Sequence, residues 1–451
     1  MKERMEAKLM MKIKKIAKYA GIGVLALALI AIVTNAILSC SANKELEQEL
    51  ADIKASGGAL KFEELAPPAI PDEENAAPLY EKAFALLKSD KLSPEEEKVW
   101  NKITASERGK EWAETDRSIL KGLLARNQNV LELLAKAAAL KKCRFSVDYS
   151  KPLDIVPPSI AQNRQASWLL AVKAQLESSE GKTDEALNTC LAGFRMTKAH
   201  ILSPLLITQL VQSASTGIIL DTLEGILKQD SGNAAMYTAL LDELKIPEYH
   251  NAFIRSMEGE RCFGLYVYEL CSEGIDPETY PPATRALGKR LVSKTFIFKK
   301  DQVYYLRLMK KIINLSKLSY KETKGGLNFE VDVIKEIPSY CYLTRLMVPG
   351  LSGVYRTQSG FEARLGAARL ALALKAYKLQ NGNYPDALAA LAPAVIPELP
   401  KDTFTGNDYV YKKDGVGFIV YSLGENLKDD GGLNNNNKDK KQDDISWQCK
   451  Q

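Results

Sequence analysis

The most polar cluster in the middle of the chain comprises His250, Glu258, Glu260 and Arg261. Carboxylates beside an imidazole could exchange protons with a substrate as general acid and base. Such groups also form ion pairs between helices, and structural networks of this kind are common. The cluster therefore defines a candidate site without identifying a reaction. His200, the other histidine, is interpreted as a polar or cationic group at the negative end of a helix.

Three short matches to catalytic motifs lack the residues that would complete them. Gly181-Lys182-Thr183 resembles the end of a phosphate-binding loop, but Leu176 occupies the position of the required glycine. Ser179 and Lys182 have the spacing seen in penicillin-binding enzymes, without the two partner motifs. Glu177-Ser178 resembles the Glu-Ser of lytic transglycosylases, yet the motif does not continue. The sequence thus predicts neither nucleotide binding nor an identified enzyme activity.

Charge and cysteine usage exclude several classes of function. Of the 61 cations and 56 anions, seven cations and two anions precede Lys44, which leaves 54 of each in the rest of the chain. A neutral body argues against nucleic acid as a partner, because such binding requires a basic face. The seven cysteines show no C-x-x-C spacing, and two histidines are too few for a multi-histidine metal centre. Disulfides stay open, although Cys262 and Cys271 lie on one predicted helix and cannot pair with each other.

The elements that position these residues begin with an apolar run near the N-terminus. Residues 20–38 carry no charge, and at about 1.5 Å per residue such a helix covers the roughly 30 Å hydrocarbon core. The preceding cations predict a cytoplasmic N-terminus (residues 1–18) and an extracytoplasmic body. We therefore expect residues 19–40 to be a retained single-pass anchor in a bacterial inner membrane. The alternatives are a lipoprotein lipidated at Cys40, where Ile37-Leu38-Ser39-Cys40 resembles a lipobox, and a cleaved signal peptide.

Hydrophobic periodicity predicts a mainly α-helical body after the anchor. The prolines of LAPPAIPDEEN predict an extended spacer over residues 41–74. Residues 75–250 form a domain of antiparallel helical hairpins, in which Gly181 ends one helix and Thr183 caps the next. The segment 181–194 resembles the second half of a tetratricopeptide unit, which makes the hairpins partly tetratricopeptide-like.

The second half of the body contains further helices and one hairpin. The apolar run 205–229 should lie at the centre of the core, because it is apolar on most faces. Residues 251–360 form a second helical layer, with its best helices at 251–270 and 301–318. In the C-terminal domain, residues 361–451, a helix with one apolar stripe ends at Gly382. A β-hairpin follows at residues 408–423, around Asp414-Gly415.

Four segments of the C-terminal region resemble a known family, namely ALKAYKLQNGNYPDAL (373–388), LPKDTFTGNDYVY (399–411), YSLGEN (421–426) and DISW (444–447). Together they are similar to the C-terminal half of the major pseudopilin of bacterial type II secretion. The resemblance implies a small α+β pseudopilin-like domain. The N-terminus lacks a prepilin cleavage sequence, so we do not expect the chain to polymerise as a pilus subunit.

The same resemblance implies a calcium site. It places the ligands on the Leu423 carbonyl and on Asp429, Asp430 and Asp444, and oxygen ligands from several carboxylates are what calcium requires. The ion would be structural and would tie the tail to the hairpin. The alternative is a solvated, disordered acidic tail, because runs of Asn, Asp and Lys bury too little surface to order themselves.

These features predict a membrane-anchored extracytoplasmic protein-interaction or assembly protein of the cell envelope, with secretion as one setting, since helical hairpin layers expose concave binding surfaces. The alternative is a membrane-tethered hydrolase that acts on envelope polymer or peptide through a carboxylate site. Expected partners are the membrane, through residues 19–40, and other envelope proteins, with no nucleic acid and no nucleotide. Buried glutamates near His250 in a deep cleft would favour the hydrolase, and a shallow groove would favour the binding protein.

Overall fold

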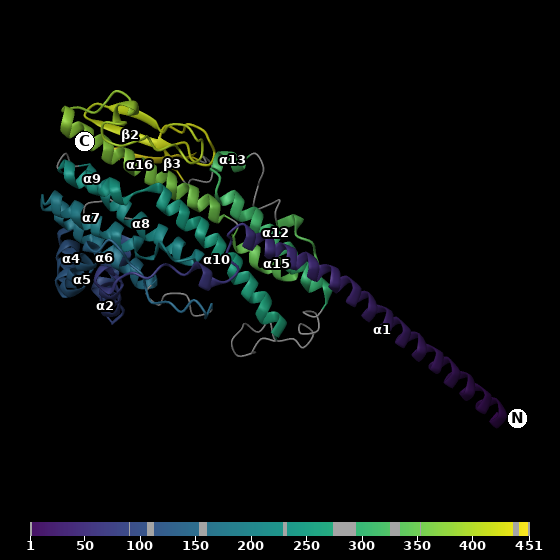
Figure 1. Cartoon of the computed structure of the whole chain (residues 1–451). Helices are drawn as coiled ribbons and strands as arrows, with labels where there is room; N and C mark the ends of the chain where they lie inside the picture. The colour runs from purple at the N-terminus through teal and green to yellow at the C-terminus, as the bar shows by residue number, and fades with distance from the viewer. Residues whose placement is uncertain are drawn as a thin grey trace. The chain divides into compact units, whose positions relative to one another are not determined.

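The structure, a computed structural model, describes residues 2–89, 91–105, 112–152, 160–228, 232–273, 295–324, 334–351, 353–435 and 442–449. It is mainly α-helical, as predicted, with a small antiparallel sheet near the C-terminus (Figure 1). The chain divides into two compact units. Unit 1 comprises Met1–Leu60, Gly264–Lys310 and Ile334–Gly350, and unit 2 comprises Lys61–Phe263, Lys311–Val333 and Leu351–Gln451.

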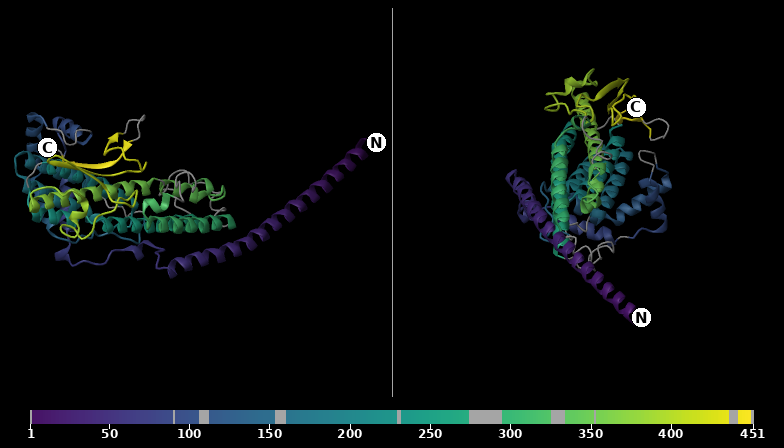
Figure 2. Two further views of the ribbon diagram at one scale, coloured as in Figure 1. Left: turned by 90° about the horizontal axis from the view of Figure 1, so that it is seen from above. Right: turned by 90° about the vertical axis from the view of Figure 1, so that its right-hand side faces the viewer.

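Among the described residues of unit 1, one helix is long and apolar enough to cross a membrane. This helix, α1 (Lys2–Ala55), is continuous (Figure 2). It includes the predicted anchor and extends through the first part of the predicted spacer. The other elements of unit 1 come from the later part of α10 (Ile246–Glu273), the first part of α12 (Phe296–Ser316), α14 (Ile334–Glu336), α15 (Tyr342–Met347) and the 3-10 turn η6 (Val348–Leu351).

A buried carboxylate holds three segments of unit 1 together. Asp301 on α12 is 3% exposed and accepts hydrogen bonds from the Tyr268 hydroxyl at 2.8 Å and the Thr344 hydroxyl at 2.6 Å. It also accepts one from the backbone N–H of Leu343 at 2.9 Å, in the first turn of α15. A negative charge at a helix N-terminus is favourable, so Asp301 fixes where this short helix begins.

Unit 2 is a helical body that carries the sheet. Its helices are α2 (Ala77–Ser89), α3 (Pro94–Ala105), α4 (Glu114–Arg126), α5 (Gln128–Ala139), α6 (Ile160–Ser179), α7 (Thr183–Thr197), α8 (Leu206–Leu227), α9 (Ala234–Glu243), α13 (Tyr320–Lys324) and α16 (Val354–Asn381), with short 3-10 turns at Phe62–Leu65, Asp72–Glu74, Lys198–His200 and Leu388–Leu391.

Helices α6 and α7 form the predicted hairpin. Gly181 adopts φ +78°, a left-handed conformation that glycine tolerates at a helix end. The prediction of Thr183 as the cap is wrong by one position, because α7 begins at Thr183 and Lys182 is the N-cap. Gly193 permits the close approach of α7 to α8, since a Cβ there would lie 2.8 Å from Ile219.

Two helices form the centre of the unit 2 core. Helix α8 is largely buried, as predicted from its apolar run. Helix α16 is buried on most faces between Phe361 and Ala376, rather than along one stripe. Leu379, near the end of the helix, is 48% exposed because the last turn of α16 extends beyond the core. Gly382 ends the helix with φ +80°, as predicted.

The sheet covers α16 (Figure 1). Strands β1 (Val410–Asp414) and β2 (Gly417–Ser422) form the predicted hairpin, with Val410 opposite Tyr421. Strand β5 (Ile445–Cys449) pairs with the other edge of β2 and was not predicted as a strand. Two short strands, β3 (Asn434–Asn435) and β4 (Gln442–Asp443), pair separately.

Gly366→Ala should destabilise the protein by about 1–3 kcal/mol, the usual cost of overpacking. A Cβ at this position on α16 would lie 2.1 Å from the Tyr409 hydroxyl, which donates a hydrogen bond of 2.8 Å to the Ala363 carbonyl. Gly225→Ala on α8 is the matched control, because nothing lies within 4 Å of its Cβ; it should be neutral or stabilising by up to about 1 kcal/mol. Thermal unfolding measures both, and equal effects would contradict the proposed close contact.

Candidate functional site

A cavity of about 340 Å³ opens in unit 2 where three segments meet. The segments are the beginning of α10, the first three turns of α16 and the loop 401–406, with Leu318 and Ser319 also lining the cavity. Its walls combine apolar and polar side chains. The lining residues are Ile246, Pro247, His250, Asn251, Phe253, Leu318, Ser319, Tyr355, Gln358, Ser359, Glu362, Lys401, Asp402, Thr403 and Gly406.

An imidazole and a buried carboxylate form a pair in this cavity. His250 Nδ1 lies 3.0 Å from Glu362 Oε1, and Gln358 Nε2 donates to the same oxygen at 2.8 Å. Glu362 is 5% exposed, whereas the His250 side chain is 27% exposed. The hydrogen bond to Glu362 raises the pKa of His250 above its ordinary value, against the opposing effect of burial.

The helical repeat of α16 brings these groups to one side. Tyr355, Gln358, Ser359 and Glu362 follow one another at helical spacings of three, one and three residues, so they share one face of the helix. On the adjoining face, Phe361 packs edge-on against Tyr249 of α10, with ring centroids 5.4 Å apart. The apolar contact and the polar pair therefore join the same two helices.

Asp402 fixes the loop that closes the cavity. This carboxylate is 1% exposed. It accepts hydrogen bonds from the Phe404 N–H at 3.1 Å and the Thr405 hydroxyl at 2.9 Å within the loop. It also accepts one from the Ser422 hydroxyl at 2.6 Å, at the end of β2. The loop is consequently attached to the sheet and holds a defined wall opposite α10.

The Nε2 atom of His250 is available for proton transfer or for binding a ligand. With Nδ1 directed at Glu362, the neutral imidazole presents Nε2 as an acceptor, and this atom makes no hydrogen bond to any described residue. The nearby hydroxyls are engaged in the fold. Tyr355 donates to the Leu318 carbonyl at 2.6 Å, and Ser319 donates to Glu322 at 2.7 Å. The site can therefore accept or donate a proton at His250, without an adjacent activated nucleophile among the described residues.

The other members of the predicted acidic cluster have different roles. Glu260 accepts a hydrogen bond from the Leu206 N–H at the start of α8, and burial raises the pKa of this carboxyl to about 7. A Cβ on Gly259 would meet the carbonyl oxygen of Pro204 at 1.7 Å, so α10 packs tightly against this loop. No hydrogen bond or ion pair among the described residues joins Glu258 or Glu260 to His250. The structure therefore pairs His250 with Glu362 instead.

The other motif residues also stabilise the fold. Glu177 forms an ion pair with Lys173 and accepts a hydrogen bond of 2.7 Å from Thr189, which joins α6 to α7. The interpretation of His200 as a cation is wrong. Its ring stacks on Phe145 at 4.3 Å, and burial lowers its pKa to about 4, so it is neutral at pH 7.

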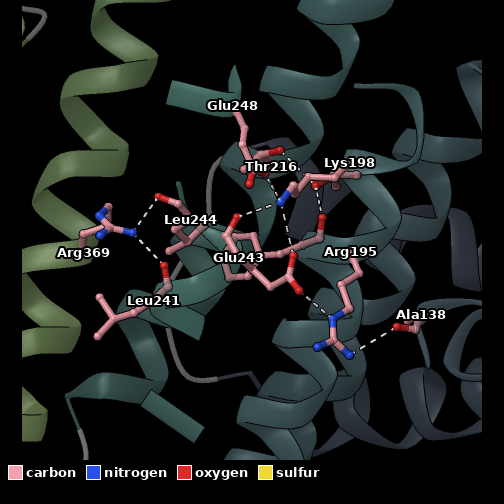
Figure 3. Close-up of polar contacts among 11 residues, drawn as sticks. Ala138, Arg195, Lys198, Thr216, Leu241, Glu243, Leu244, Glu248 and Arg369 are labelled. Atoms are coloured by element: carbon pink, nitrogen blue, oxygen red, sulfur yellow. Dashed lines mark hydrogen bonds and ion pairs between the residues drawn. The ribbon is translucent and has the colours of Figure 1, made fainter. Parts of the chain in front are cut away.

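A second polar cluster joins the ends of several helices (Figure 3). The Glu243 carboxylate at the end of α9 lies 2.8 Å from Arg195 Nε and 3.3 Å from Lys198 Nζ. Arg369 of α16 donates to the carbonyls of Leu241 and Leu244, at 2.6 and 3.1 Å. Cations at a helix C-terminus are favourable. The cluster therefore serves to hold α9 against α7 and α16.

The aspartates predicted to bind calcium lie in one loop region, with Asp430 and Asp444 in direct contact. Asp444 Oδ2 accepts hydrogen bonds from the N–H groups of Asp430 and Gly432, at 3.0 and 2.8 Å. Asp444 is fully buried, and its Oδ1 has no hydrogen-bond partner among the described residues. Burial, reinforced by the charges of Asp430 and Asp429, raises its pKa to about 6.

The other two predicted calcium ligands, Asp429 and Leu423, make hydrogen bonds to groups other than Asp430 and Asp444. Asp429 accepts a hydrogen bond of 2.8 Å from the Tyr421 hydroxyl, which lowers its pKa. The Leu423 N–H faces Asp402 at 3.4 Å. Within the described ranges, no three His, Cys, Asp or Glu side chains are grouped as a metal site requires. The oxygen-rich donor set suits calcium by its chemistry, and the calcium site remains a prediction.

Comparison with known proteins adds no assignment. No protein-family model, curated protein or solved structure matches the chain.

The seven cysteines, which could have formed disulfides, are all free.

Sequence reasoning identified His250 but missed Glu362 and Asp402. Glu362 is the only acidic residue in α16, a helix whose surroundings are apolar, and an isolated carboxylate in such a helix was the available signal. Asp402 precedes a short Thr- and Gly-containing turn, a common setting for a side chain that bonds to the backbone. Neither signal identifies the partner, which comes from a distant part of the chain.

Glu362→Gln should lower the pKa of His250, because the hydrogen bond to this carboxylate is the main cause of its raised value. The folded protein binds the His250 proton more tightly than the unfolded chain. The resulting stabilisation is fully present below pH 6.5 and is lost as the pH rises through the raised pKa. Ring signals in a nuclear magnetic resonance titration measure the change, since the chain has only two histidines.

Glu258→Gln on the same helix is the matched control and should leave the His250 titration unchanged. His200 serves as an internal reference, because its pKa is about 4. A His250 titration that responds to the change at Glu258 and not to the change at Glu362 would refute the pairing.

Proposed function

We propose that the protein is a membrane-anchored extracytoplasmic protein of the cell envelope whose helical body binds a partner protein at the His250–Glu362 cavity. The observation that carries the proposal is the buried, hydrogen-bonded Glu362 beside a partly exposed imidazole in a defined cavity. Ligand sites typically combine an apolar wall with a few placed polar groups. Here Ile246, Phe253 and Leu318 supply apolar surface.

The membrane location is proposed from α1. The apolar run and the seven preceding cations support a single-pass anchor with a cytoplasmic N-terminus, in a bacterial inner membrane. Lipidation at Cys40 is the alternative route to the same compartment. The sequence resemblance of the C-terminal segments to the major pseudopilin of type II secretion is the basis for proposing an assembly role, with secretion as one setting.

One observation favours a second function. The carboxylate of Glu362 orients His250 and raises its pKa, as in sites where a histidine acts as general acid or base. A membrane-tethered hydrolase acting on envelope polymer or peptide would use His250 to activate water. The engaged hydroxyls of Tyr355 and Ser319 leave a covalent route through a side-chain nucleophile without support, so this reaction would depend on His250 and water alone.

A photo-reactive amino acid at Thr403, on the edge of the cavity, should capture an extracytoplasmic envelope protein in living cells. Capture should weaken in the Glu362→Gln variant, because the hydrogen bond that orients His250 weakens. The same amino acid at Val416, the 62% exposed tip of the hairpin, is the control and should not capture this partner. Mass spectrometry of the cross-linked products measures both.

Two outcomes would contradict the binding proposal. One is equal capture from Thr403 and Val416 that does not depend on Glu362. The other is turnover of a cell-wall polymer or peptide by the purified protein, lost in Glu362→Gln, which would replace binding by hydrolysis.

We also propose a structural calcium ion in the C-terminal loop, held by the Leu423 carbonyl, Asp429, Asp430 and Asp444. Its support is the buried Asp444 Oδ1 without a partner among the described residues, since an ion would satisfy this oxygen and offset the repulsion between carboxylates. The ion would tie the tail to the β1–β2 hairpin.

Calcium should raise the thermal unfolding temperature of the protein, and Asp444→Asn should abolish this increase. Asp386→Asn is the matched control, because the Asp386 side chain is 98% exposed and lies outside the loop. An unfolding temperature that does not respond to calcium in the parent protein would rule out the site.

A further inference from the structure

The start of α12 is hydrogen-bonded to α1 at a point inside the apolar run. The backbone N–H of Phe296 donates to Asn35 Oδ1 at 3.1 Å, and both residues belong to unit 1. From residue 20 to residue 34, α1 is exposed along its length, and Asn35 is the first half-buried residue. The apolar run is therefore bare except at its outer end, where α12 begins.

The position of Asn35 in the apolar run sets the depth of Phe296 in the bilayer that α1 would span. The apolar run ends at Leu38, three residues beyond Asn35, which corresponds to about 4.5 Å along a helix. If residues 20–38 span the hydrocarbon core, Phe296 lies at the outer boundary between acyl chains and headgroups. This step rests on the proposed membrane anchoring through α1.

The contacts between the two helices change character beyond that boundary. Lys300 of α12 pairs with Glu45 of α1, and Arg307 pairs with Glu49 at 2.6 Å. Both ion pairs lie outside the apolar run, where water and headgroups solvate charges. An amide hydrogen bond inside the run followed by ion pairs beyond it is the sequence of contacts expected for two helices leaving a bilayer.

Exposed apolar and aromatic side chains lie on the two segments of unit 1 that Asp301 joins. Ile297, in the first turn of α12, is 38% exposed, and Tyr340 and Leu346 are 48% and 65% exposed. Asp301 holds the N-terminus of α15 through Leu343. It lies five residues after Phe296, about 7.5 Å along α12, which is within the depth of the headgroup region.

We propose that the first turn of α12 and the exposed face of α15 are embedded in the outer interface of the bilayer that α1 spans. Ile297 and Leu346 would contact the upper acyl chains, and Tyr340 would lie at headgroup level, where tyrosine is enriched. Lys299 follows Phe296-Ile297-Phe298 directly, and its long side chain would extend to anionic phosphates of the headgroups. Unit 1 would thus contact lipid through a second surface in addition to α1. This contact sets the depth and rotation of the anchor in the bilayer.

Tryptophan quenching by lipid tests the proposal in the full-length protein. The protein is reconstituted into phosphatidylcholine and phosphatidylglycerol vesicles whose acyl chains carry bromine either near the headgroups or near the bilayer centre, so that both depths are probed. Ile297→Trp and Leu346→Trp should each add emission that is blue-shifted and lost in brominated vesicles. Emission of the four native tryptophans is subtracted with the parent protein.

Two further variants distinguish a failure of the interface contact from a failure of the membrane anchor. Lys310→Trp, exposed on the same helix and 13 residues beyond Ile297 or about 20 Å, should not be quenched. Leu29→Trp, in the middle of the apolar run, should be quenched if α1 is inserted. Quenching of Leu29→Trp, with either Ile297→Trp or Leu346→Trp quenched no more than Lys310→Trp, overturns the interface contact and leaves the anchor intact. Absence of quenching in Leu29→Trp overturns the anchor itself.

Discussion

The cavity depends on one constraint, the burial of a carboxylate in a helix that forms the centre of the core. Glu362 is 5% exposed on α16, and a charge in such a place is costly unless donors surround it. His250 and Gln358 supply those donors. The pairing joins α10 to α16, and it leaves the imidazole directed into the cavity with a raised pKa. The requirement for stability thus leaves a partly exposed ionisable ring in the cavity.

Three further acids among the described residues also accept hydrogen bonds from donors of the fold. In unit 1, Asp301 accepts hydrogen bonds from the first turn of a helix and from two hydroxyls. In unit 2, Asp402 accepts hydrogen bonds from its loop and from the end of strand β2. Glu260 accepts the first N–H of α8. Each is enclosed by donors that belong to the fold. Glu362 differs because one of its donors is an ionisable ring that remains partly exposed, so the pair can respond to a ligand or to pH.

The distribution of apolar and charged side chains differs between α1 and the helical body. Along α1, apolar side chains are exposed over the run that the membrane would cover, whereas Glu45 and Glu49 pair with cations of α12 beyond it. In the helical body, Glu243 collects Arg195 and Lys198 at helix ends, where partial charges of the backbone favour them. In both units these carboxylates are paired with cations of neighbouring elements.

The sequence alone determined the helical class, the long apolar helix near the N-terminus, the α6–α7 hairpin and the β1–β2 hairpin, because each follows from local periodicity, glycine positions or turn chemistry. It did not determine strand β5, whose partner lies in β2 across a polar loop. It grouped His250 with Glu258 and Glu260 because they are neighbours in the chain. Only the tertiary structure assigned Glu362, 112 residues away. The reason is physical: the cost of burying a charge depends on which donors the packed helices bring within hydrogen-bond distance, and no local pattern records that.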